Sequence, residues 1–185
     1  DSNPLQSSKD EIQAQVAFDL PPPADFSGVK NGTYENGDRY EGNWVNGKRE
    51  GIGNFVSDIS KYEGYWRADK RHGIGKEAFD DNSRYEGEYA DDFFEGQGKQ
   101  WLSDGRRFEG KFKKDLWNGQ GSIFSKEGKL LYQGEMEDNY VHGKAKKFYP
   151  DGKVEYEGEF KAGVFDGHGT QITKSENKFT GKFAK

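Results

Sequence analysis

The sequence of 185 residues has no cysteine, and it has only three histidines and one methionine. Without cysteine the chain can have no disulfide framework, no thiolate nucleophile and no cysteine-ligated metal. Three histidines at wide separation do not form a metal-site pattern. The many carboxylates recur at the same position of a repeated pattern, and nothing singles out two of them as an acid/base pair. The sequence therefore predicts no metal, no cofactor and no enzymatic activity.

Long apolar runs and a strong excess of charge are also absent. No stretch approaches the roughly 20 apolar residues that a membrane-spanning helix requires. The net charge is only −5, so the chain lacks the basic field that a nucleic-acid-binding protein needs. We expect no nucleic-acid partner, and an anionic membrane is a less favoured partner for the same reason.

Aromatic residues and glycines are plentiful, and they recur in register about every 23 residues, a spacing typical of repeat proteins. The first copy reads Tyr40-Glu41-Gly42-Asn43-Trp44. We call its first aromatic residue the anchor; glycine follows two residues later, and a large side chain follows four residues later. The anchors are Tyr40, Tyr62, Tyr85, Phe108, Tyr132, Tyr156 and Phe179.

Strand geometry explains the spacing, because positions i, i+2 and i+4 of a strand point to one face. Two large side chains then flank a bare glycine, over which a ring from a neighbouring strand can lie. Turn-forming residues such as Asn46 and Gly47 follow, and a second segment beginning Gly51-Ile52-Gly53 returns. The predicted fold class is all-β: an elongated, solenoid-like ribbon of consecutive antiparallel β-hairpins.

The pattern Y-E-G-x-W-x-x-G-x-x-x-G-x-G, read from Tyr40 to Gly53, resembles the MORN repeat (membrane occupation and recognition nexus). The resemblance covers residues 31–185 as a half unit, six full hairpin units and a truncated seventh. It implies a module of tethering, ciliary or cytoskeletal assemblies, and it favours a cytoplasmic, cytoskeletal or ciliary location. The sequence itself names no compartment and no partner.

Residues 1–30 form a leader to this array. Ser8 to Glu11 match a helix capping box, so we expect a short helix from about Lys9 to Asp19. Three prolines, Pro21 to Pro23, would end it and stiffen the link. The leader either docks on the repeats or is an extended, disordered segment.

The fifth unit departs from the pattern at two positions. It has Met136 where the other units have a ring, and Ala145 where a glycine is expected. The added methyl group falls where backbones approach closely, and methionine is more adaptable than a ring. We expect the ribbon to change its twist near residues 134–148.

A single-layer sheet has no second layer to cover its faces, so we expect part of the ring row to stay accessible as a partner-binding groove. Glutamates at the second position of each unit would form a charged rim to it. The predicted groove residues are Tyr40, Trp44, Tyr62, Trp66, Tyr85, Tyr89, Trp101, Phe108 and Phe112, and the predicted rim residues are Glu41, Glu63, Glu86 and Glu109.

The favoured function is a non-catalytic scaffold that captures a partner peptide or helix with apolar anchors in a basic or polar context. The alternative is a membrane-associated module that binds phosphoinositides or other anionic lipids through its lysine clusters. The last strand leaves an open sheet edge at Phe179, Gly181 and Phe183, which either supports homodimerisation or is blunted by nearby lysines.

Overall fold

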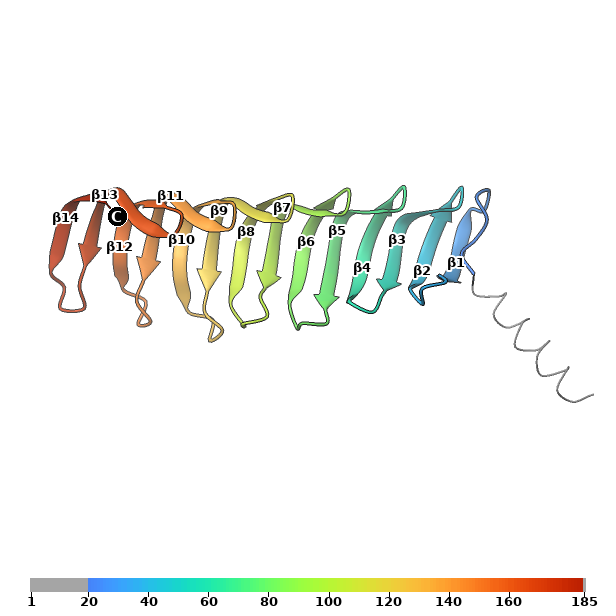
Figure 1. The fold of residues 1–185 in the computed structure, drawn as a ribbon, viewed down its shortest axis with the longest axis horizontal. Coiled ribbons are helices and arrows are strands. Elements are labelled where there is room, and N and C mark those ends of the chain that lie inside the picture. The colour runs from blue at the N-terminus through green and yellow to red at the C-terminus, as the bar shows by residue number, and fades with distance from the viewer. Residues whose placement is uncertain (1–19, 185) are drawn as a thin grey trace, which may run out of the picture.

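The computed structural model describes residues 20–184, and the predicted leader helix at Lys9 to Asp19 lies outside them. The described chain forms one open antiparallel sheet of fourteen strands in chain order (Figure 1). It contains no helix, so the predicted all-β hairpin ribbon is confirmed. The strands are β1 (Gly28–Thr33), β2 (Arg39–Val45), β3 (Lys48–Val56), β4 (Ser60–Arg67), β5 (Lys70–Phe79), β6 (Arg84–Ala90), β7 (Phe93–Trp101), β8 (Arg107–Lys113), β9 (Leu116–Phe124), β10 (Leu130–Glu137), β11 (Tyr140–Phe148), β12 (Val154–Lys161), β13 (Val164–Ile172) and β14 (Lys178–Phe183).

The pairing register aligns one glycine from almost every strand in a straight row across the ribbon. Each member of this glycine row lies directly opposite the next, from β2 to β14. Only β11 interrupts it, with Ala145. The row is Gly42, Gly53, Gly64, Gly75, Gly87, Gly98, Gly110, Gly121, Gly134, Ala145, Gly158, Gly169 and Gly181.

The row consists of glycine because an anchor ring lies against it. A Cβ atom added to Gly64 would come 2.5 Å from the hydroxyl of Tyr62 and 2.6 Å from the Cα atom of Gly75. The Tyr62 hydroxyl reaches across and donates a hydrogen bond to the carbonyl of Tyr65 at 2.9 Å. The anchors Tyr40, Tyr85 and Tyr156 make the equivalent bond.

A second glycine in each unit allows the hairpin to bend. Gly51, eleven residues after its anchor, has a positive φ of 69°, and the β2–β3 register shifts between Gly42 and Trp44. Positive φ is open to glycine at little steric cost, and a β-bulge bends and twists its strand. The equivalent shift recurs in every hairpin, and Figure 1 shows the ribbon curving over along its upper edge.

Tight two-residue turns close the hairpins and bind one unit to the next. Asp91 and Asp92 both have positive φ, as a type I′ turn requires. The backbone N–H of Asp92 donates to the carbonyl of Arg71 at 3.0 Å, and the Asp92 Oδ1 atom accepts from the backbone N–H of Arg71 at 2.9 Å. This two-bond clasp recurs between Asp69 and Arg49, and at two further turns. Each turn is thereby fixed on the preceding one.

Residues 20–27 cover the end of the sheet beside β1. Pro22 is buried and Phe26 packs against the core. The carbonyl of Phe26 accepts a hydrogen bond from the backbone N–H of Gly47 at 2.9 Å, and Lys30 Nζ donates to the carbonyl of Leu20 at 2.9 Å. The proline-containing segment is therefore anchored to the first hairpin.

Because an anchor ring lies against the glycine row, we predict different stability losses for two alanine substitutions in that row. Gly64→Ala should destabilise the chain by about 1–3 kcal/mol, because the methyl group would displace the Tyr62 ring. Gly181→Ala, in the same row on β14, should cost far less, since a Cβ atom there would have no neighbour within 4 Å. Denaturant unfolding of both variants measures the difference. Equal losses would contradict the role assigned to the ring.

Candidate functional site

The anchor and the large side chain four residues after it share one face of the sheet, which we call the ring face. Four anchors, Tyr40, Tyr62, Tyr85 and Tyr156, pack edge-on against that side chain and against the equivalent ring of the next unit. Tyr62 meets Trp66 and Tyr89 with ring centroids 5.2 and 5.1 Å apart. Such T-shaped pairs contribute about 0.5–1.5 kcal/mol beyond the area they bury. The rings are therefore a structural seam.

The seam is sealed, and the prediction that it lines an accessible groove is wrong. Eight of the nine predicted groove residues lie in this seam with exposed fractions of 0–4%. They are Tyr40, Trp44, Tyr62, Trp66, Tyr85, Tyr89, Phe108 and Phe112. No partner can reach these rings while the sheet is folded.

A second tier of side chains on the ring face covers the seam in place of a second layer. It comes from positions nine and fifteen after each anchor. Phe94, for example, stacks flat on the anchor Tyr85 with centroids 3.7 Å apart, and the Arg49 guanidinium lies 4.1 Å from the Trp66 ring centroid. The tier consists of Arg49, Arg71, Phe94, Trp117, Val141 and Phe165 at the ninth position, and of Phe55, Glu77, Gln100, Ile123, Lys147 and Gln171 at the fifteenth.

One buried carboxylate in this tier is fully paired. Glu77 forms an ion pair with Arg71, accepts from the Ser60 hydroxyl at 2.8 Å and accepts from the Tyr89 hydroxyl at 3.2 Å. Arg71 is also held by Asp92 at 3.2 Å. A buried charge with a full set of partners holds its surroundings together. We therefore interpret this cluster as structural.

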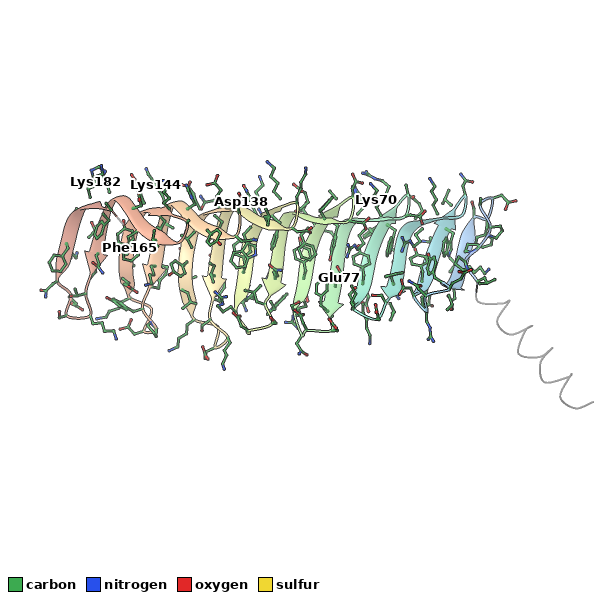
Figure 2. All side chains as sticks on the ribbon, in the orientation of Figure 1. Lys70, Glu77, Asp138, Lys144, Phe165 and Lys182 are labelled. Atoms are coloured by element: carbon green, nitrogen blue, oxygen red, sulfur yellow. The ribbon has the colours of Figure 1, made fainter. Side chains whose placement is uncertain are left out.

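The predicted glutamate rim lies on the opposite side of the sheet, which we call the outer face. Glu41 follows Tyr40 directly, and neighbouring residues of a strand point to opposite faces. Since the anchor rings and the four predicted rim glutamates point to opposite faces, the rim prediction is wrong. Figure 2 shows both sides: Phe165 lies beneath the curved edge, while the outer-face residues Lys144 and Lys182 project above it. All four predicted rim residues, Glu41, Glu63, Glu86 and Glu109, are on the outer face.

Trp101 is also on the outer face, so its assignment to the ring groove is wrong. It pairs directly with Arg84 on β6 and Arg107 on β8. The Arg84 guanidinium lies 3.9 Å from the Trp101 ring centroid, a cation–π contact. Trp101 thus belongs to a row of alternating arginine and aromatic residues on the outer face.

The sequence interpretation missed an exposed apolar patch on the outer face. Ile52, Tyr65 and Ile74 are 59%, 50% and 59% exposed. Ile52 pairs directly with Tyr65 on the neighbouring strand. The Tyr65 side chain lies against Gly73, which precedes Ile74. These three residues form a continuous stripe across β3, β4 and β5.

The stripe is local to the first two units. Its members occupy the third and twelfth positions after an anchor, where later units carry polar residues such as Glu88, Gln97, Lys111 and Gln120. This change in residue type along one row is visible in the sequence and could have revealed the patch. A core position would stay apolar in every repeat.

Carboxylates border the patch. Glu41 and Glu63 lie in the neighbouring outer-face row and are exposed. Neither is in an ion pair within residues 20–184. Farther along the same row the glutamates are paired, as in Lys99–Glu109 at 3.5 Å and Lys146–Glu157 at 3.1 Å. Glu63 lies directly opposite Lys76 on β5, whereas Glu41 faces only Asn31 and Asn54. Glu41 is therefore the carboxylate beside the patch that has no cationic cross-strand neighbour.

The remaining chemical candidates lie apart from one another. His142 contacts Glu137 at 3.2 Å, and His72 lies 4.0 Å from Asp91, both near hairpin turns. Within the described residues, no three histidine or acidic side chains are close enough to hold a metal ion. None of the described residues forms a helix of the length and hydrophobicity needed to cross a bilayer.

The last strand, β14, pairs with β13 alone among the described strands. Phe183 packs inward on the anchor Tyr156 with ring centroids 5.1 Å apart. Phe179 and Gly181 are exposed. The residues predicted to form a dimer edge therefore divide between the core and the surface.

A single-layer ribbon of bulged hairpins, with one glycine row and one ring seam, defines a β-hairpin repeat protein. The MORN repeat model matches six segments of the chain, at residues 40–58, 62–84, 85–106, 108–128, 132–154 and 156–177. Together they cover most of the described residues. The chain belongs to the MORN repeat family.

Other comparisons add little. No curated protein matches the chain. Among solved structures, selenomethionine-substituted virginiamycin B lyase from Staphylococcus aureus aligns at 13% identity and a TM-score of 0.18, covering 89% of this chain and 58% of that one. A catalytically inactive variant of that lyase with quinupristin aligns at 14% identity and 0.19, covering 86% and 57%. The chain spans less than two thirds of both lyase chains, and scores this low support no inference.

Because four anchor and seam tyrosines are buried, we predict that the sheet unfolds at alkaline pH. Burial raises the pKa of four phenols, those of Tyr40, Tyr62, Tyr85 and Tyr89, above the ordinary value. A raised pKa in the folded state stabilises the fold below the unfolded pKa of about 10, and this stability is lost as the pH rises above it. The tyrosinate absorbance of these four buried phenols should therefore appear together with the loss of the β-sheet circular dichroism signal above that pH.

A tyrosine-to-phenylalanine variant provides the control. Tyr85→Phe should lose the 2.8 Å hydrogen bond to the Glu88 carbonyl but should lose stability less steeply with alkaline pH. Phe108 shows that a phenylalanine ring fits an anchor position. Complete ionisation of the tyrosines with the sheet signal intact would show that the rings are open to solvent.

Proposed function

We propose that this chain is a non-catalytic scaffold that binds a partner protein on its outer face. The supporting observation is the exposed stripe of Ile52, Tyr65 and Ile74 on three neighbouring strands of a rigid sheet. Exposed apolar groups that lie together on an otherwise polar surface are characteristic of interaction sites. The buried ring seam supports this role indirectly, because it holds the stripe in fixed geometry.

The chemistry of the surroundings indicates the kind of partner. Glu41 and Glu63 favour lysine or arginine in the bound segment, beside apolar residues that cover the stripe. The stripe crosses the strands at about 4.8 Å per strand, whereas one turn of a helix rises about 5.4 Å. An amphipathic helix laid along the ribbon would therefore place about one apolar side chain over each strand. We propose a basic amphipathic helix as the partner segment.

The lipid-binding alternative has weaker support. Alternation places Lys144 and Lys146 on the outer face, while Lys147 belongs to the ring face. Lys146 is paired with Glu157 and Lys147 with Glu155. Membrane attraction depends on several unpaired basic residues acting together at one surface. This cluster is therefore divided between the two faces and largely paired, which leaves the exposed Lys111, Lys113 and Lys114 as the main support for the alternative.

Homodimerisation through the C-terminal repeats stays a prediction. The exposed Phe179 on β14 supports it, since an unpaired strand edge can add a further strand. The inward packing of Phe183 limits the apolar surface that such a contact could bury. This edge is distinct from the stripe, which lies on β3 to β5.

Peptide selection on the purified chain tests the proposal. Peptides selected from a random helical library should be enriched in leucine, phenylalanine, lysine and arginine. The triple variant Ile52→Thr, Tyr65→Thr, Ile74→Thr should weaken their binding about tenfold or more, which corresponds to 1.4 kcal/mol or more. Threonine suits a strand, so the sheet should remain folded by circular dichroism.

The matched control changes the same row in later units. Gln97→Thr with Gln120→Thr should leave the affinity of the selected peptides unchanged, because these residues lie outside the stripe. The proposal is wrong if the peptides bind the triple variant as tightly as the unmodified chain. It is also wrong if only the control variant loses binding.

A further inference from the structure

The ring seam is interrupted between the fourth and fifth units. Successive ring contacts link Trp44 to Trp117. A second series links Tyr132 to Phe183. No ring pair among the described residues joins Trp117 to Tyr132. Met136, which takes the place of a ring, lies at this gap.

Ala145 explains why Tyr132 is less buried than the anchors of the other five complete units. Ala145 is buried in the glycine row, directly opposite Gly134 and Gly158. Its methyl group occupies space that an anchor ring takes in the other units. Tyr132 is accordingly only partly buried, whereas the anchor Tyr156 of the next unit is sealed.

The second tier on the ring face is also incomplete in the fifth unit. In each of the other five complete units, the residue nine after the anchor places a planar group, either a ring or a guanidinium, beside the anchor ring. In the sixth unit, Phe165 stacks on Tyr156 with centroids 3.8 Å apart at an interplanar angle of 6°. The fifth unit has Val141 at this position, so no planar group from the described chain stacks on Tyr132.

An open surface pocket of about 520 Å³, which we call the cavity, lies at this gap on the ring face. Trp117, Ile123, Tyr132 and Val141 provide its apolar walls, and Asp115 and Asn139 are polar residues in its lining. Ligand pockets are commonly about 300–1,000 Å³, with a few polar groups among apolar walls. The cavity is large enough for one aromatic side chain.

We propose that this cavity binds an aromatic side chain, best a tryptophan, of a partner polypeptide. The ring would occupy the planar-group position that Val141 leaves incomplete and stack on Tyr132. An arginine suits it less, because the cationic Arg106 already lies in the lining. The aspartate of the next turn that holds Arg49 and Arg71 also has no counterpart here. The turn after Val141 contains Ala162 and Gly163, which carry no charge. An indole N–H would have the Asp115 carboxylate within the same cavity lining as an acceptor.

This inference depends on the proposed function only in that the occupant belongs to a bound protein. The cavity and the stripe lie on opposite faces and in different units. A segment that occupied both would have to wrap around the edge of the ribbon. The two sites can therefore fail separately, and variants of Ile52, Tyr65 and Ile74 should leave the cavity unchanged.

Two small probes test the cavity, indole and N-acetyltryptophanamide, each titrated into the full chain and followed by amide NMR. Both should give saturable shifts confined to the residues that line the cavity and their neighbours in the sheet, with a dissociation constant on the order of 1 mM, as expected for so few atoms. Shifts spread over the molecule, or no saturation, would overturn the proposal. Binding of indole without N-acetyltryptophanamide would indicate a small-molecule cavity and would equally overturn it.

Filling the cavity from within is the sharper test. Val141→Phe should place a ring where Phe165 lies in the next unit, raise the melting temperature and weaken both probes at least tenfold. Val29→Phe, at an exposed position of β1, is the control and should change neither property. Unweakened probe binding to a folded Val141→Phe chain would contradict the proposal. If that variant fails to fold, Tyr132→Ala replaces it, and retained affinity after loss of the stacking surface is the contradicting result.

Discussion

The close approach of an anchor ring to a bare glycine backbone is the constraint on which the rest of the structure depends. A single sheet has no second layer to bury its apolar face, so each ring must find its contacts within the sheet. Glycine makes this feasible because the ring can lie directly on the backbone, with its hydroxyl reaching a carbonyl three residues on. Replacing one glycine by alanine, as the chain itself does at Ala145, moves the ring outward and opens a gap.

This constraint divides the two faces between stability and recognition. The ring face holds nearly all of the buried aromatic surface, and the second tier of side chains on that face covers the seam. The outer face carries little of the packing, so its residues can vary from unit to unit, and an apolar stripe can arise at Ile52, Tyr65 and Ile74 without disturbing the core. The aspartate clasps between turns, as at Asp92, add a regular polar connection along one edge.

The fold was predictable from the sequence because ring, glycine and turn recur at fixed spacing. The accessibility of the rings was not, because it depends on side chains at the ninth and fifteenth positions, whose identities vary from Arg49 to Val141. The rim prediction for Glu41 and the groove assignment of Trp101 failed for a simpler reason: strand alternation places both on the outer face. The patch at Tyr65 and the cavity beside Tyr132 are departures from the repeat, and they become visible only when the units are compared position by position.

The central claim is that the ring face is a sealed core and that the outer face meets solvent. Acrylamide quenching of tryptophan fluorescence in the intact chain and in Trp101→Phe measures this directly. Trp44 and Trp66 are buried in the seam and Trp117 in the tier that covers it, whereas Trp101 is partly exposed on the outer face. The account predicts that Trp101→Phe removes most of the quenchable emission. A variant that stays as quenchable as the intact chain would contradict it.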